Sequence, residues 1–391
     1  MYRNRRRQND SFDYLFLLPG TLPYPTGGHK VTYELCRGLS RMGYNVGLAF
    51  INDVYKEIYL VDKDPLVKSF LKKRKYVFRL YETIVNTKIG FRTILPILRF
   101  LMRIEYKEEL DDVRLFFSFK QVSRHCVERA IAASWQTSFL LTNMNGAKRK
   151  YYLIHHHEDE ISFSDYVLPL ASKSYGLDLK KIVINEKTYD KFRDSKPIRT
   201  RIGHDIEKYH SNIPPENRIA DLVVFPLREG LDKGSEIALQ VAAGVAEKFP
   251  NARLVSFGNY RPKDIPKGVE HLGFINDKDL IKLLGNATVF FLPSLIEGFS
   301  LIGIEAMAAG VAVVSIDNGG VREYLNDGQN GMLVYEDYIN NSISVISRLL
   351  TQRDLRIKLA KAGFETAKLY SFEYMHESFF RAISEYERQL G

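Results

Sequence analysis

The stretch that decides the fold is Leu292–Gly310, which reads LPSLIEGFSLIGIEAMAAG. It begins at the end of the short apolar run 288–292, TVFFL, which is typical of a central parallel strand. Apolar residues then recur at helical spacing up to Gly310, which has the position of a helix C-cap. The run 311–316, VAVVSI, has the composition of the next strand. The stretch therefore predicts one strand, helix, strand unit of an α/β fold.

The turn inside this unit is a candidate ligand site. In a parallel sheet, ligands bind beyond the carboxyl ends of the strands, where a helix N-terminus offers free N–H groups to an anion. Glu297 and Glu305, with seven residues between them, flank the turn, and both are expected to face one pocket. The alternative is that the two acids only stabilise the helix dipole. The residues expected to approach the ligand with their backbone are Gly298, Phe299, Ser300 and Leu301.

A second cluster of charge lies after the apolar run 221–225, DLVVF. The loop that follows carries Arg228 and Lys233, and a helix is expected from about Gly234 to Lys248. Two cations at the carboxyl end of a strand suit a diphosphate, because Arg binds in a bidentate way and Lys acts as a point charge. A solvated loop is the alternative.

The segment 292–334 carries a specific resemblance. It reads LPSLIEGFSLIGIEAMAAGVAVVSIDNGGVREYLNDGQNGMLV. It resembles, along its whole length, the hallmark segment of retaining GT-B glycosyltransferases of the "glycosyl transferases group 1" type, family 4. The match includes both glutamates, the Gly319–Gly320 turn, and the pairs Asp327–Gly328 and Asn330–Gly331.

The resemblance implies two Rossmann-like domains that face a central cleft. It also implies transfer of a sugar from a nucleoside-diphosphate sugar to an acceptor hydroxyl, with retention of anomeric configuration and without a metal or other cofactor. Glu305 would bind the nucleotide ribose, and Glu297 would contact the donor sugar. Arg228 and Lys233 match the family's diphosphate-binding pair.

The same resemblance implies roles for two further turns. The run 14–18 leads into a loop with the pair Gly27–Gly28, and a helix is expected from about His29. The pair would lie beside the donor's phosphate and sugar. The backbone at Phe274 and Ile275 would lie against the nucleotide base, although simple packing is an equal alternative for these two side chains.

Three adjacent histidines follow the strand expected at 150–154, in the segment His155–Glu158. Consecutive side chains do not converge on one ion, and no HxxxH pair or cysteine lies near them, so we favour a ligand-facing role over a metal site. The resemblance implies that one of them reaches the donor sugar or the acceptor. We choose His156, and His156 or Glu158 would be the base if the enzyme inverted configuration.

The length of 391 residues suits two domains. We expect an N-terminal acceptor domain at 1–195, a nucleotide-sugar domain at 196–370, and a C-terminal helix at 371–391 that crosses back to the first domain. The run Lys181–Asn185 is expected to be the last strand of the first domain, and Arg193–Arg201 the linker.

The formal charge of +9 is concentrated in two places. Residues 1–10 carry four Arg against one Asp, and residues 65–110 carry eleven Lys or Arg against four Glu, with apolar residues between them. An anionic membrane surface is the expected partner of 65–110, and a solvated basic helix is the alternative. The sequence has no recognised nucleic-acid module, no apolar run long enough to span a membrane, and only two cysteines. We expect a cytoplasmic protein with peripheral attachment at the inner membrane face.

We therefore interpret the chain as a hexosyltransferase-type enzyme that builds a polysaccharide or glycoconjugate on a glycan or lipid-linked acceptor. One rival is a GT-B sugar-phosphate enzyme, such as an epimerase or a phosphorylase. The other is a subunit that keeps the fold only to bind a partner or a membrane.

Overall fold

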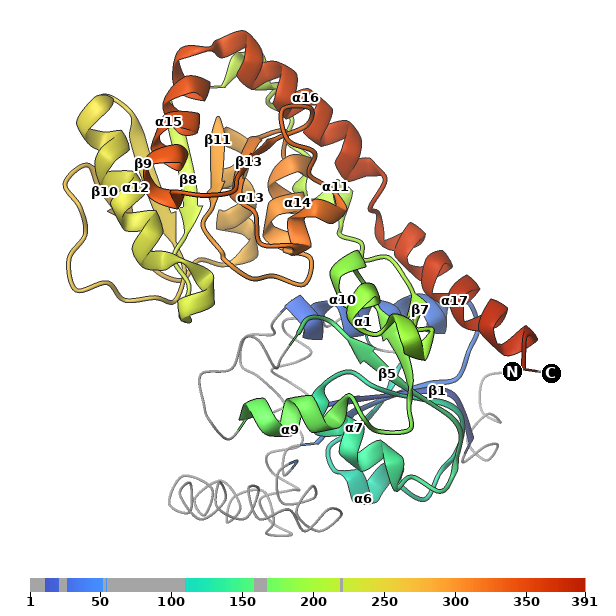
Figure 1. Cartoon of the computed structure of the whole chain (residues 1–391). Coiled ribbons are helices and arrows are strands. Elements are labelled where there is room, and N and C mark those ends of the chain that lie inside the picture. The colour runs from blue at the N-terminus through green and yellow to red at the C-terminus, as the bar shows by residue number, and fades with distance from the viewer. Residues whose placement is uncertain are drawn as a thin grey trace, which may run out of the picture. The chain divides into compact units, whose positions relative to one another are not determined.

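The computed structural model describes residues 11–20, 27–51, 54, 110, 112–157, 167–218 and 221–390. The chain divides into two compact units, each built around one parallel sheet (Figure 1). Unit 1 takes its residues from Met1–Val183, Lys191–Thr200 and Phe379–Gly391. Unit 2 takes its residues from Ile184–Asp190 and Arg201–Ser378. Each unit is therefore assembled from segments that are separated in the sequence.

The sheet of unit 1 has seven parallel strands in the order β3-β2-β1-β4-β5-β6-β7. The first six follow the order 3-2-1-4-5-6 of dinucleotide-binding folds, which reverses direction between β1 and β4. Burial on both faces explains the continuous apolar runs at the centre of the sheet. The strands are β1 Ser11–Leu18, β2 Val46–Phe50, β3 Arg114–Phe116, β4 Cys126–Ala132, β5 Ala147–Ile154, β6 Lys180–Val183 and β7 Ile198–Arg199.

The helices of unit 1 start and stop at recognisable signals. The hydroxyl of Ser134 accepts the Thr137 amide and caps α7. The chain after α1 turns at Gly43, which has a φ of 91°. Met42, the residue directly after α1, is 44% exposed because it lies beyond the helix. The elements are α1 Gly27–Arg41, α6 Phe119–Val122, α7 Trp135–Thr142, α9 Val167–Ser174 and the 3-10 turn η1 Arg193–Ser195.

One sequence expectation about this sheet is wrong. The run Lys181–Asn185 is not its last strand, because β7 follows it and pairs in parallel with β6 through Ile182 and Ile198. The segment Arg193–Arg201, expected to be a linker, therefore contains an edge strand. A strand of two residues between polar neighbours has no periodicity by which the sequence could reveal it.

The sheet of unit 2 has six parallel strands in the order β10-β9-β8-β11-β12-β13, which repeats the 3-2-1-4-5-6 pattern and reverses between β8 and β11. Its strands are β8 Leu222–Pro226, β9 Arg253–Phe257, β10 Val269–His271, β11 Val289–Leu292, β12 Ala312–Ile316 and β13 Met332–Val334. Its helices and 3-10 turns are α10 Glu186–Lys191, α11 Ile206–Tyr209, η2 Pro215–Asn217, η3 Leu231–Lys233, α12 Ser235–Lys248, α13 Asp277–Asn286, α14 Leu301–Ala308, η4 Gly320–Glu323, α15 Tyr338–Thr351 and α16 Arg353–Lys368.

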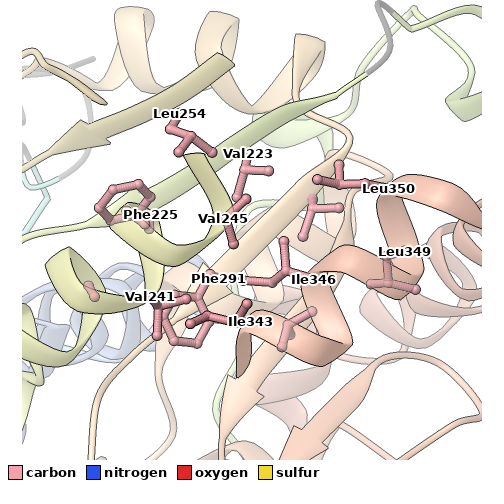
Figure 2. Packing of buried hydrophobic residues seen from close by; sticks show 14 of the residues in the cluster. Val223, Phe225, Val241, Val245, Leu254, Phe291, Ile343, Ile346, Leu349 and Leu350 are labelled. Atoms are coloured by element: carbon pink, nitrogen blue, oxygen red, sulfur yellow. The ribbon is translucent and has the colours of Figure 1, made fainter. Parts of the chain in front are cut away.

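The core of unit 2 lies between the sheet and helices α12 and α15 (Figure 2). On α12, Val241 and Val245 are four residues apart and share one face, as helical geometry requires. On α15, Ile343 and Ile346 are three residues apart and also share one face. These side chains meet Phe291 and its neighbours on the strands, so the core fixes the strand ends on which the site is built.

The last helix, α17, spans Phe372–Arg388 and is shared by the two units. Its residues up to Ser378 belong to unit 2, and those from Phe379 onward belong to unit 1. Within unit 1, the carboxylate of Glu387 accepts hydrogen bonds from Arg129 and from the hydroxyl of Tyr151. Among the described helices, none is long and apolar enough to cross a membrane.

Candidate functional site

The best-defined group of polar side chains in unit 2 lies where the strand order reverses. β8 and β11 are neighbours in the sheet and run in parallel, so their carboxyl ends lie at the same edge. Arg228 follows β8 by two residues, and Ser294 and Glu297 follow β11. The crevice outside this reversal is where open α/β sheets bind ligands.

Arg228 and Lys233 converge on Glu297. One Oε atom of Glu297 lies 2.6 Å from Nη2 of Arg228 and 3.3 Å from Nζ of Lys233. The same Nη2 donates to the hydroxyl of Ser294 at 2.6 Å. The main chain of Arg228 is held as well, because its N–H donates to the Ser235 hydroxyl and its carbonyl accepts from that hydroxyl. The first residue of α12 therefore positions the arginine.

The charge state of Glu297 follows from these contacts. Burial on its own would raise the pKa of this carboxyl, but Arg228 and Lys233 outweigh burial and lower the pKa to about 2. The side chain is only 12% exposed. Glu297 is therefore a carboxylate throughout the physiological range, and it is bound to two cations.

Hydrogen bonds and a close backbone contact fix the turn between β11 and α14. The carbonyl of Gly298 accepts from Nδ2 of Asn185 at 2.6 Å, and the carbonyl of Ser300 accepts from the Tyr324 hydroxyl at 3.0 Å. Ser300 has a φ of 69°, in the left-handed region. A Cβ on Gly320 would lie 2.7 Å from backbone atoms of the turn, so only glycine permits this approach. The first amides of α14, which have no partner within a helix, follow this rigid turn.

Glu305 has partners different from those of Glu297. It lies on α14, is 8% exposed, and hydrogen-bonds the hydroxyl of Tyr209 on α11. Burial and the nearby carboxylate of Glu305 raise the pKa of Tyr209. The neighbouring Lys208 makes an ion pair with Asp277 at 2.6 Å. Glu305 is thus anchored one turn along α14, outside the cluster formed by Arg228, Lys233 and Glu297.

The turn after β10 presents Phe274 and Ile275. Phe274 is 57% exposed. Ile275 is half-buried.

In unit 1, Gly28 of the glycine pair lies beside His155. A Cβ on Gly28 would lie 3.3 Å from Cδ2 of His155. Both ring nitrogens of His155 are buried and have no hydrogen-bond partner among the described residues. Burial, followed by the charges of His156 and His29, lowers the pKa of His155 to about 3, so the ring is neutral. His156 is half-buried and Gly27 begins α1.

His157, the third histidine of the segment, is buried. Its ring packs edge to face against that of Phe192, with 6.4 Å between the ring centroids. Glu158 lies outside the described residues. Within the described part of the chain, no group of three or more His, Cys, Asp or Glu side chains is placed to hold a metal ion.

Several side chains that shape the site could not be identified from the sequence. Asn185, which holds the carbonyl of Gly298, and Tyr209, which holds Glu305, come from segments far from these partners in the sequence. Ser294 and Asp232 adjoin predicted residues, but a serine or an aspartate in a loop carries no signal by itself.

Comparison with known proteins finds similarity over part of this chain. Residues 211–366 match the family model described as "Glycosyl transferases group 1". An uncharacterized glycosyltransferase of Methanocaldococcus jannaschii is 32% identical over 145 residues, which are 34% of this chain and 37% of that protein. A D-inositol 3-phosphate glycosyltransferase of Corynebacterium urealyticum is 29% identical over 158 residues, 36% of this chain and 37% of that protein. The matches therefore span little more than a third of these curated relatives.

The likeness in structure extends over the whole chain. HepE of Anabaena, solved in complex with UDP-glucose, superposes with a TM-score of 0.68 at 13% identity, covering 96% of this chain and all of that one. The expected α/β fold with two Rossmann-like domains is confirmed. Residues 211–366 thus match the glycosyl transferases group 1 model, within a chain that has the GT-B fold.

Proposed function

We propose that this protein is a glycosyltransferase that moves a sugar from a nucleoside-diphosphate sugar to an acceptor hydroxyl, with retention of configuration. The observation that carries the proposal is the convergence of Arg228, Lys233 and Glu297 at the reversal point of unit 2, next to the N-terminus of α14. Cations and helix amides at such a point suit a diphosphate.

Each group of unit 2 then has a role. Arg228, Lys233 and the amides of the turn hold the diphosphate and stabilise its charge as it departs. Glu297 contacts the donor sugar, and Glu305, held by Tyr209, contacts the ribose. The nucleotide base lies against the turn at Phe274 and Ile275. The backbone that approaches the phosphates belongs to Gly298, Phe299, Ser300 and Leu301.

Unit 1 supplies the second set of contacts in this proposal. Gly27, Gly28 and His156 bind the sugar or the acceptor. The contact of His155 with Gly28 makes His155 a second candidate for this role. In this proposal Arg228, Lys233 and the amides of the turn stabilise the leaving diphosphate, and no metal or other cofactor takes part.

The retention proposed here uses no protein carboxylate as a nucleophile. Glu297 is bound to two cations and Glu305 to a tyrosine hydroxyl, so neither is free to attack the anomeric carbon. The departing diphosphate would itself assist deprotonation of the acceptor on the same face. An inverting enzyme would need a base on the opposite face.

The experiment measures ligand binding first and products second. A thermal-shift panel with UDP, GDP, ADP and dTDP, and with their sugars, identifies the donor, because a ligand bound only by the folded state raises its stability. Proton NMR of the product then reads the new anomeric linkage. Retention supports the proposal and inversion contradicts it. Release of a sugar phosphate or an epimerised nucleotide-sugar would favour the rival enzyme classes, and no binding would favour the non-catalytic subunit.

For the acceptor we propose a class of molecule, a glycan or a lipid-linked sugar in polysaccharide or glycoconjugate assembly. The residues proposed to attach the protein to the cytoplasmic face of an anionic membrane are 65–110. All of them but Leu110 lie outside the described residues, so the proposal rests on their sequence.

A further inference from the structure

Asp232 is a carboxylate at the site to which the proposed function gives no role. It lies in η3, directly before Lys233, and is 8% exposed. Its Oδ2 atom is 2.9 Å from Nζ of Lys233. This oxygen makes no hydrogen bond within the part of the chain that the structure describes. The ammonium of Lys233 is therefore what compensates the buried negative charge.

The backbone holds Asp232 in this position. Its carbonyl accepts from the amide of Leu295 at 2.8 Å, which ties η3 to the loop after β11. The same loop limits the residue after Lys233, because a Cβ on Gly234 would lie 2.0 Å from the carbonyl oxygen of Pro293. The aspartate therefore lies on a rigid turn next to the lysine.

The four charges at the site sum to zero without a ligand. Arg228 and Lys233 contribute two positive charges, and Asp232 and Glu297 contribute two negative ones. The lysine is shared, with one carboxylate at 2.9 Å and the other at 3.3 Å. A diphosphate that binds Lys233 must therefore share the ammonium with both carboxylates or displace one of them.

From this sharing, and given the proposed function, we infer that Asp232 is a positioning residue that holds Lys233 in the empty site and competes with the nucleoside diphosphate for it. The competition lowers the affinity of the site for the diphosphate. A transferase must release this product after each turnover, so the aspartate speeds that release. Glu297 has a separate role in the proposal, since it also contacts the donor sugar.

The test replaces Asp232→Asn, which keeps the size of the side chain and the backbone bond to Leu295. Titration calorimetry of the full chain with UDP, GDP, ADP and dTDP should give a Kd for the bound nucleotide that is about fivefold lower than that of the parent, which corresponds to about 1 kcal/mol. In turnover assays, the KM for the donor and kcat should both fall, since product release becomes slower. The gain in affinity should shrink with added salt.

Control variants separate charge from shape. Glu216→Gln neutralises an ion pair with Lys361 elsewhere in unit 2 and should leave the Kd unchanged. Asp232→Glu retains the charge and should stay close to the parent. Asp232→Ser is a second neutral variant, to be measured if the asparagine variant does not fold.

The outcomes distinguish the two proposals. If the parent binds a nucleotide and both neutral variants bind it with the same or lower affinity, the inference about Asp232 is overturned while the proposed function stands. If the parent binds none of the four nucleotides, both are overturned. Tighter binding in the neutral variants, lost at high salt, supports the inference.

Discussion

At the residue scale, each of the four charged side chains of the site forms an ion pair with another of them when no ligand is bound. Arg228 and Lys233 bind Glu297, and Lys233 also binds Asp232. The sequence predicted three of these four, because residues that follow a strand end are expected at a ligand site whatever the rest of the fold. Asp232 could not be predicted, since its significance depends on a distance of 2.9 Å to Nζ of Lys233.

The first prediction concerns the two cations. Arg228→Ala and Lys233→Ala should each weaken nucleoside-diphosphate binding by about 1.5–3 kcal/mol, because charge-assisted hydrogen bonds to phosphate are lost. Titration calorimetry measures the change in Kd. Arg253→Ala is the control, because Arg253 belongs to a surface pair with Glu270 at 3.6 Å. Unchanged binding in both site variants would disprove the assignment of the phosphate site.

The second prediction concerns pH. The folded pKa of Glu297 is about 2, below its ordinary value of about 4.3, so its ion pairs stabilise the fold fully above about pH 4.3 and are lost as the pH falls through about 2. Glu297→Gln should therefore lower the melting temperature of unit 2 at pH 6 much more than near pH 2.5. The contribution is on the order of 3 kcal/mol. Scanning calorimetry across this pH range measures it, and a constant difference would contradict the prediction.

At the scale of elements, the sequence predicted best where strands are buried on both faces. The runs at β8, β11 and β12 are apolar and bounded by turn residues, so their bounds were predicted to within one residue. The edge strand β7 was missed because two residues make no pattern. The histidine that contacts Gly28 was equally hidden, because three identical neighbours differ only in the direction that the backbone gives each side chain.

The third prediction concerns the end of α17. Arg129 donates from Nε and Nη2 to Glu387 at 2.8 and 2.6 Å, and the Tyr151 hydroxyl donates at 2.7 Å. Glu387→Ala leaves the half-buried guanidinium without this partner and should destabilise unit 1 by about 1.5–3 kcal/mol. Hydrogen exchange of residues 379–388 should accelerate. Glu385→Ala, on an exposed position of the same helix, should have little effect. Equal exchange rates in the two variants would show that Glu387 does not anchor the helix.

At the scale of the whole molecule, the fourth prediction concerns attachment to a surface. Residues 65–110 carry eleven basic residues against four acidic ones, and basic amphipathic segments gain both apolar insertion and attraction to anionic lipid. The full chain should sediment with anionic liposomes at low salt and detach at high salt. Replacing Lys72, Lys73 and Lys75 together with Gln should weaken this binding. Equal sedimentation with neutral liposomes, or none with either, would leave only a solvated basic segment.

The division of the chain into units has a consequence for its biosynthesis. Unit 1 contains Phe379–Gly391 as well as the first strands, and unit 2 lies between them in the sequence. Domains generally fold as they leave the ribosome, from the N-terminus onward. Unit 1 is translated first, but the place of the end of α17 in it stays unfilled until residues 379–391 have been translated. A nascent chain stalled before residue 379 should therefore contain a complete unit 2 and an incomplete unit 1. Chaperones that recognise exposed apolar surface should bind the incomplete unit 1, although it was translated first.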